Sequence, residues 1–161
     1  MKKLIIVMLI AYLSCPAVCL AGEGSFDDIV SLINMKPGEA TPQDVTSKFG
    51  KPATIEESRK THIWHYVTNK GDLSIYWDND NLKMEKISFT TVAGTQVKAF
   101  DNSYAPFLRA GKSKLSEVLG ALGAPHNMTI KPVNQELHYS YQNKILHLFF
   151  RKGTLVNYSF F

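Results

Sequence analysis

The sequence predicts an α+β protein made of two tandem αα-βββ units, with an antiparallel sheet and helices packed on one face. Two observations predict this class. The chain matches itself without a gap at a shift of 73 positions, and each copy passes from helical spacing to alternating apolar and polar residues. The matched pairs include Gly38/Gly111, Val45/Val118, Gly50/Gly123, Pro52/Pro125, His65/His138, Tyr66/Tyr139, Leu73/Leu146 and Leu82/Leu155.

Residues 1–21 have the order of a secretory signal peptide. Lys2 and Lys3 precede an apolar run, and small residues end at Ala21. We therefore expect an exported protein, periplasmic or secreted, with a first repeat over residues 22–92 and a second over 93–161. Lipid attachment at Cys15 is the competing interpretation. Both cysteines, Cys15 and Cys19, lie in the leader, so the mature chain would fold without disulfides.

Helix signals open each unit. Apolar residues at helical spacing predict a helix over residues 25–34, and Thr41-Pro42-Gln43-Asp44 predicts the start of a second helix that ends at Gly50. The second unit repeats this with residues 104–108 and with a helix that Ser113 would cap and Gly123 would end.

Strand signals follow in each unit. Residues 62–68 and 73–78 flank a tight turn at Asn69–Asp72, and residues 137–142 and 145–150 flank Asn143-Lys144. Third strands are expected to begin at Leu82 and Leu155. Alternation places one set of side chains under the helices, namely Trp64, Tyr66, Leu73, Ile75 and Trp77 with Leu137, Tyr139, Tyr141, Leu146, Leu148 and Phe150.

The other face of the predicted sheet combines aromatic, histidine and aliphatic side chains with small polar ones. This composition is typical of a recognition surface, although packing against a linker or a terminus is the alternative. The predicted partner-binding residues, with Asp72 from the first turn, are Ile63, His65, Val67, Asp72, Ser74, Tyr76, His138, Ser140, Gln142, His147 and Phe149.

Catalytic and metal signals are weak in this chain. His138 and His147 share a face as diagonal neighbours, but only Glu136 stands near them as a further ligand. No Ser/His/Asp set or close pair of acids is evident, so we expect no enzyme activity, no metal and no cofactor. The net charge of +4 falls by two when Lys2 and Lys3 are removed, which argues against nucleic acid as a partner.

The residues resemble a known family. Leu108, Gly111, Val118, Leu122-Gly123 and Pro125, with a Trp-x-Tyr strand at Trp64, resemble the SmpA/OmlA/BamE repeat of the outer-membrane assembly lipoprotein. Two such units in tandem resemble the β-lactamase inhibitory protein. The spacing departs from the family, because Val118 lies seven residues after Gly111 instead of six.

The resemblance implies a function in protein binding. The first expectation is a periplasmic or envelope binding module without catalytic activity, which leaves peripheral membrane association open. The alternative is a secreted proteinaceous enzyme inhibitor of the β-lactamase inhibitory protein type. In that family an aspartate in the turn between the first two strands enters the target's active site, and Asp72 lies near that place. The partner would be an envelope protein or a secreted target enzyme.

Overall fold

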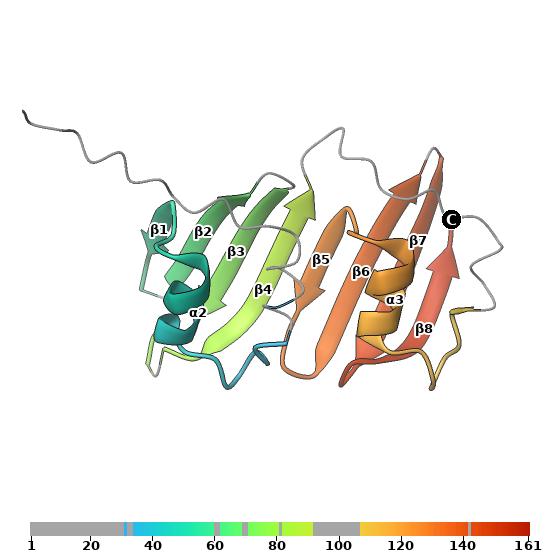
Figure 1. Cartoon of the computed structure of the whole chain (residues 1–161), viewed down its shortest axis with the longest axis horizontal. Coiled ribbons are helices and arrows are strands. Elements are labelled where there is room, and N and C mark those ends of the chain that lie inside the picture. Colours follow the sequence, from blue (N-terminus) through green and yellow to red (C-terminus); the bar gives the residue numbers. More distant parts are fainter. Residues whose placement is uncertain are drawn as a thin grey trace, which may run out of the picture.

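One antiparallel sheet of eight strands dominates the protein, and its strands follow one another in sequence order (Figure 1). The computed structural model describes residues 31, 34–59, 62–68, 71–80, 82–91, 107–141 and 143–161. The two helices are α2 (Pro42–Phe49) and α3 (Leu115–Leu122). The strands are β1 (Thr54–Glu57), β2 (His62–Thr68), β3 (Gly71–Trp77), β4 (Met84–Thr91), β5 (Asn127–Ile130), β6 (Asn134–Tyr141), β7 (Lys144–Arg151) and β8 (Thr154–Phe160).

The antiparallel sheet is confirmed, but the prediction of two tandem αα-βββ units with helices packed on the sheet is wrong. Each half of the described chain has one short α-helix followed by four strands. Of the predicted helix over residues 25–34, only Ser31 and Asn34 are described, and Phe107 and Leu108 are not α-helical. The signal peptide and the linker from residue 92 also lie outside the described residues.

The two strands that the sequence analysis missed are β1 and β5. All four residues of β1 are exposed, so no burial pattern marks it, and it exists through pairing with β2. In β5, Met128 and Ile130 are buried between more exposed neighbours, which is a short alternating pattern. Strand β5 pairs with β4, bringing Ile87 opposite Ile130 and Phe89 opposite Met128. This pairing joins the halves into one sheet.

Local capping signals explain where the helices begin and end. Thr41 is the N-cap of α2; its backbone N–H and hydroxyl both donate to the Asp44 carboxylate, at 2.9 and 2.7 Å. The prediction for the second helix is wrong in detail, because Lys114 is the N-cap of α3 and its N–H donates to Glu117. The Ser113 hydroxyl instead accepts from the Arg109 N–H at 2.9 Å.

A single hydrophobic cluster includes side chains from both helices and both halves of the sheet. In Figure 1 the two helices lie in front of the sheet. The predicted inner set is buried wherever its side chains are described, and the registers Tyr66 opposite Leu73 and Tyr139 opposite Leu146 place it on one face. Alternation therefore predicted the core face correctly.

Equivalent contacts recur 73 positions apart. The Tyr66 hydroxyl donates to the Gly50 carbonyl at 3.3 Å, and the Tyr139 hydroxyl donates to the Gly123 carbonyl at 2.9 Å. Both glycines end their helices at a positive φ, 73° and 76°. A side chain is disfavoured in that backbone region, so glycine at both positions has a steric reason.

The gapless alignment breaks down after the third strand of each half. Leu82 is 43% exposed at a φ of 50°, whereas Leu155 is buried. The true counterpart of Leu155 is Met84: Trp77 pairs with Met84, and Phe150 pairs with Leu155. The turn over residues 78–83 is two residues longer than the turn over 151–154, which displaces the alignment.

Candidate protein-recognition surface

The outer face is the side of the sheet that points away from the buried cluster. Strand register places every described residue of the predicted binding set on it. Val67 lies opposite Asp72, His65 opposite Ser74, and Ile63 opposite Tyr76. In the second half, His138 pairs with His147, and Ser140 pairs with Ile145. Gln142 lies outside the described residues.

In the first half, the predicted residues differ in exposure and in their contacts. Val67 is 67% exposed, whereas Ile63 is only 8% exposed and offers little free surface. The Tyr76 ring carries the Lys86 ammonium 3.4 Å from its centroid. This part of the outer face thus presents an aromatic ring beside a positive charge.

His65 is held in place on both sides of its ring. Its Nδ1 lies 3.0 Å from the Ser74 hydroxyl, and its Nε2 lies 3.6 Å from a carboxylate oxygen of Glu56. Because β1 supplies Glu56, a strand that carries no sequence signal orients a predicted binding residue. Asp72 is exposed at the start of β3, between Val67 and Thr90 on the neighbouring strands.

The second half carries a ring cluster that consists of His138, His147, Phe149 and Phe161. The imidazoles of His138 and His147 stack with centroids 4.1 Å apart and planes 6° apart. The rings of Phe149 and Phe161 contact the His147 ring edge-on, with centroids 6.5 and 5.3 Å from its centroid. The two histidines are direct cross-strand partners, so their prediction as diagonal neighbours is wrong.

Burial and charge favour the neutral state of His138. Desolvation is the largest cause that lowers its pKa, and a charge on the stacked His147 lowers it further. Glu136 acts in the opposite direction, since its carboxylate favours the imidazolium. The surroundings of His138 therefore favour its neutral imidazole over the imidazolium.

Small polar side chains lie between the ring cluster and Tyr76. Apart from Lys86, which lies over Tyr76, the outer positions of β4 and β5 include Ser88, Thr90, Asn127 and Thr129, and Ser88 lies opposite Thr129. Sequence reasoning missed Asn127 and Thr129 because it missed β5. The alternation in Asn127-Met128-Thr129-Ile130 was the available signal. Phe161 was also missed, because it lies beyond the last strand and reaches the cluster through backbone pairing with Ile145.

The described residues contain no group of three or more His, Cys, Asp or Glu side chains placed to hold a metal ion. Across the same part of the chain, neither helix is long and apolar enough to span a membrane.

Comparison with known proteins identifies a shared fold. A putative beta-lactamase inhibitor protein from Streptococcus mutans aligns with a TM-score of 0.54 at 13% identity, covering 83% of this chain and 94% of that chain. The resemblance to the β-lactamase inhibitory protein therefore holds at the level of fold. No family model matches the sequence, and no curated protein matches it. A BamE-type repeat thus stays a prediction.

Two further solved structures align less well. An extracellular protein containing an SCP domain from Bacillus anthracis has a TM-score of 0.32 at 14% identity, covering 73% of this chain and 32% of that chain. A DUF4309 family protein from Bacillus subtilis has a TM-score of 0.29 at 12% identity, covering 84% of this chain and 95% of that chain.

Proposed function

We propose that this protein is an exported inhibitor that binds its target enzyme through the outer face of the sheet. The ring cluster carries the proposal: four rings gather on one part of the outer face, beside the small polar side chains of β4 and β5. The fold shared with a putative beta-lactamase inhibitor protein supports an enzyme as the class of partner. A beta-lactamase is accordingly the first target to test.

The geometry suits tight binding by a preformed surface. Backbone hydrogen bonds hold every strand, so the backbone beneath the outer face loses little conformational freedom when a partner docks. Eight strands at a spacing of about 4.8 Å span roughly 34 Å from β1 to β8. A face of this width can supply the ~800 Å² per partner that a stable complex buries. Aromatic residues are the side chains that most often dominate such interfaces.

The order of residues 1–21 predicts a secretory signal peptide, which supports export. Export would bring the inhibitor to secreted or periplasmic enzymes. Cell fractionation separates this function from an envelope assembly module. Release into the medium or the soluble periplasm fits an inhibitor, and retention with outer-membrane proteins fits the module.

The direct test measures hydrolysis of a chromogenic cephalosporin by purified beta-lactamases as the protein is added. We expect saturable inhibition by the wild type and at least about a tenfold loss for Tyr76→Ser/Phe149→Ser. Ile55→Ser is the matched control, because Ile55 is exposed on the opposite face of the sheet. Its inhibition should equal that of the wild type.

Thermal unfolding of the same variants shows whether the outer face is a free surface. The double variant should unfold within a few degrees of the wild type. A large loss of stability would mean that the two rings are structural, and inhibition that survives the double substitution would exclude this face as the binding site.

A further inference from the structure

A cavity lies on the helix-bearing side of the sheet, where the two halves meet. Its volume is about 780 Å³. The first half contributes residues 34 and 36–39, and the second half contributes the start of α3 and two turns, β5–β6 and β7–β8. Gly38 closes the junction, because a Cβ built on it would lie 3.4 Å from the Pro132 ring. The sequence analysis assigned no role to this region.

The floor of the cavity is apolar. Leu115 and Leu119 of α3 form it with Ile130 and Pro132. Gln135 also lines the cavity, but its side chain is already satisfied: Nε2 donates to the Lys131 carbonyl at 3.2 Å, and Oε1 accepts from the Gly153 N–H at 2.9 Å. The floor therefore favours an apolar ligand body.

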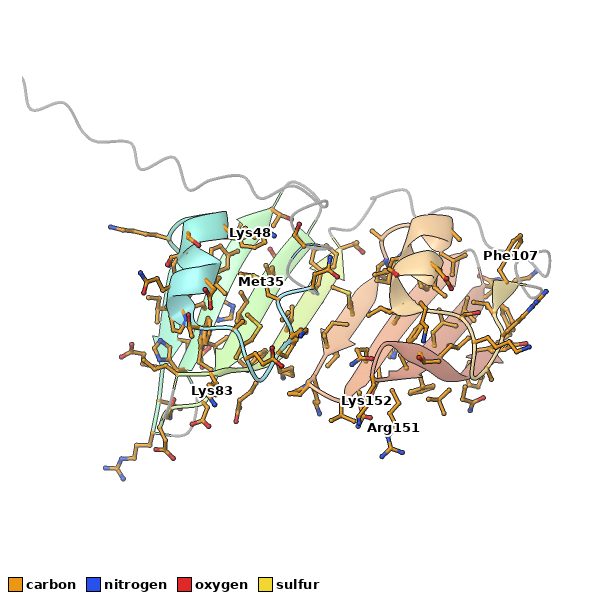
Figure 2. All side chains as sticks on the ribbon, turned by 60° about the horizontal axis from the view of Figure 1, so that its bottom comes forward. Met35, Lys48, Lys83, Phe107, Arg151 and Lys152 are labelled. Atoms are coloured by element: carbon orange, nitrogen blue, oxygen red, sulfur yellow. The ribbon has the colours of Figure 1, made fainter. Side chains whose placement is uncertain are left out.

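The rim has a net positive charge, since Lys36, Lys114, Lys131 and Lys152 line the cavity together with one carboxylate, Glu39. Lys36 pairs with Glu39 at 3.5 Å, and the Lys114 ammonium donates to the Thr154 hydroxyl at 2.9 Å. Within the described ranges, no carboxylate forms an ion pair with Lys114, Lys131 or Lys152. Figure 2 shows Lys152 on the turn between β7 and β8. The rim thus carries cationic charge that the described residues do not neutralise.

Backbone geometry gives an independent reason to consider these lysines. Three described residues other than glycine have a positive φ, and two of them are Lys36 at 49° and Lys152 at 50°. Lysine is disfavoured in this left-handed region, whereas glycine and asparagine tolerate it. Local conformation therefore does not account for lysine at either position.

We propose that this cavity binds a small amphipathic anion, with an apolar body on the floor and a carboxylate, sulfonate or phosphate group among the lysines. The volume lies within the roughly 300–1,000 Å³ of small-molecule sites. The ligand would approach on the opposite side from the recognition surface, so this site does not depend on the proposed inhibition.

The test uses two fluorescent probes with the same aromatic body. Anilinonaphthalene sulfonate carries an anionic group, and N-phenylnaphthylamine lacks it. We expect the sulfonate to bind with a stoichiometry of one and with an affinity that falls as salt rises. The uncharged probe should bind at least about tenfold more weakly. Equal affinity for both probes, or binding that salt does not weaken, would refute the proposal.

Two substitutions remove charge from the rim without opening the core. Lys152→Asn replaces a strained lysine by a residue suited to its φ, so it should weaken binding of the sulfonate roughly fivefold while raising the midpoint of thermal unfolding. Combined with Lys131→Gln, it should weaken binding about twentyfold. Lower affinity together with higher stability is a result that misfolding does not produce.

Leu82→Asn is the matched control for conformation, because Leu82 has a φ of 50° and does not line this cavity. It should raise thermal stability and leave binding of both probes unchanged. The proposal fails if Lys152→Asn binds the sulfonate as the wild type does, or if Leu82→Asn weakens binding equally.

A final arm uses vesicles of phosphatidylcholine with and without phosphatidylglycerol, in the absence of probe. Free dodecyl phosphate should displace the sulfonate from the cavity in proportion to its concentration. Failure of the free anion to displace the probe, together with binding of the protein to the phosphatidylglycerol vesicles in a sedimentation assay, would assign the lysines to a membrane surface and overturn the small-ligand site.

Discussion

At the scale of single residues, His138 links the geometry of the ring cluster to pH. Its imidazole stacks on His147, and both burial and that neighbour lower its pKa. The groups that face this pair across the sheet are Asn127 on β5 and Ser159 on β8, which carry no charge, while Glu136 adds a carboxylate from the same strand. Protonation therefore meets little local compensation beyond Glu136.

We expect the free energy of unfolding to fall as the pH drops from about 7.5 to 5. The pKa of His138 in the folded state lies below its ordinary value of 6.5, so the unfolded chain takes up the proton first. The stability that the neutral imidazole contributes is complete above the unfolded pKa and is lost as the pH falls below it. Urea unfolding at several pH values measures this slope.

His147→Gln is the control for this pH dependence, because it removes the like charge that lowers the pKa of His138 and keeps a polar side chain at the position. The slope should become shallower, and NMR titration should move the pKa of His138 upward. A pKa of His138 at or above 6.5 in the wild type would contradict the assignment.

Tyr66 and Tyr139 make equivalent hydrogen bonds of different quality. Burial raises the pKa of Tyr66 to about 12 and raises that of Tyr139 as well, so both hydroxyls remain protonated donors. Tyr139→Phe should cost roughly 1–1.5 kcal/mol, because its bond is 2.9 Å long and its side chain is fully buried. Tyr66→Phe should cost about 0.5 kcal/mol, since its bond is 3.3 Å long. Denaturant unfolding of both variants tests the order, and a larger loss for Tyr66→Phe would refute it.

At the scale of secondary-structure elements, α3 contains a glycine that its packing does not require. Gly120 is exposed within the helix, and a Cβ built on it would meet no atom within 4 Å. Gly120→Ala should therefore stabilise the protein by about 0.5–1 kcal/mol, because alanine lowers the entropy of the unfolded chain and favours the helix. Thermal unfolding provides the measurement.

Gly71 is the opposite case and serves as the comparison. A Cβ there would overlap the Thr90 carbonyl oxygen and lie 2.8 Å from the Phe89 ring. Gly71→Ala should lower the unfolding midpoint, because β3 and β4 would have to separate. If Gly71→Ala unfolds at the wild-type midpoint or above it, the close approach at Gly71 does not exist.

At the scale of the whole molecule, one hydrophobic cluster extends across the β4–β5 seam and includes both helices. We therefore predict a single cooperative unfolding transition, with equal calorimetric and van't Hoff enthalpies. A half of some 65 residues buries so little surface that it would be only marginally stable alone. Two resolved transitions in differential scanning calorimetry would show that the halves unfold independently.

The sequence predicted the parts of this architecture that depend on near neighbours. Alternation placed Trp64 and Tyr66 in the core and His65 on the outer face, and Thr41 with Asp44 marked the start of α2. It could not locate β1, whose residues are all exposed and become a strand only beside β2. It also misaligned Leu82, because a gapless comparison does not detect a longer turn.

The sequence by itself determined two kinds of feature. Strand periodicity assigned side chains to the two faces of the sheet, and capping residues marked the ends of helices to within one turn. Both act over a few residues, so they can be read locally. Only the tertiary structure decided that β5 joins the halves by pairing with β4, that His138 stacks directly on His147, and that four lysines line one cavity. These features depend on the pairing partner of each strand and on the turns that set its register, which bring together residues far apart in the chain.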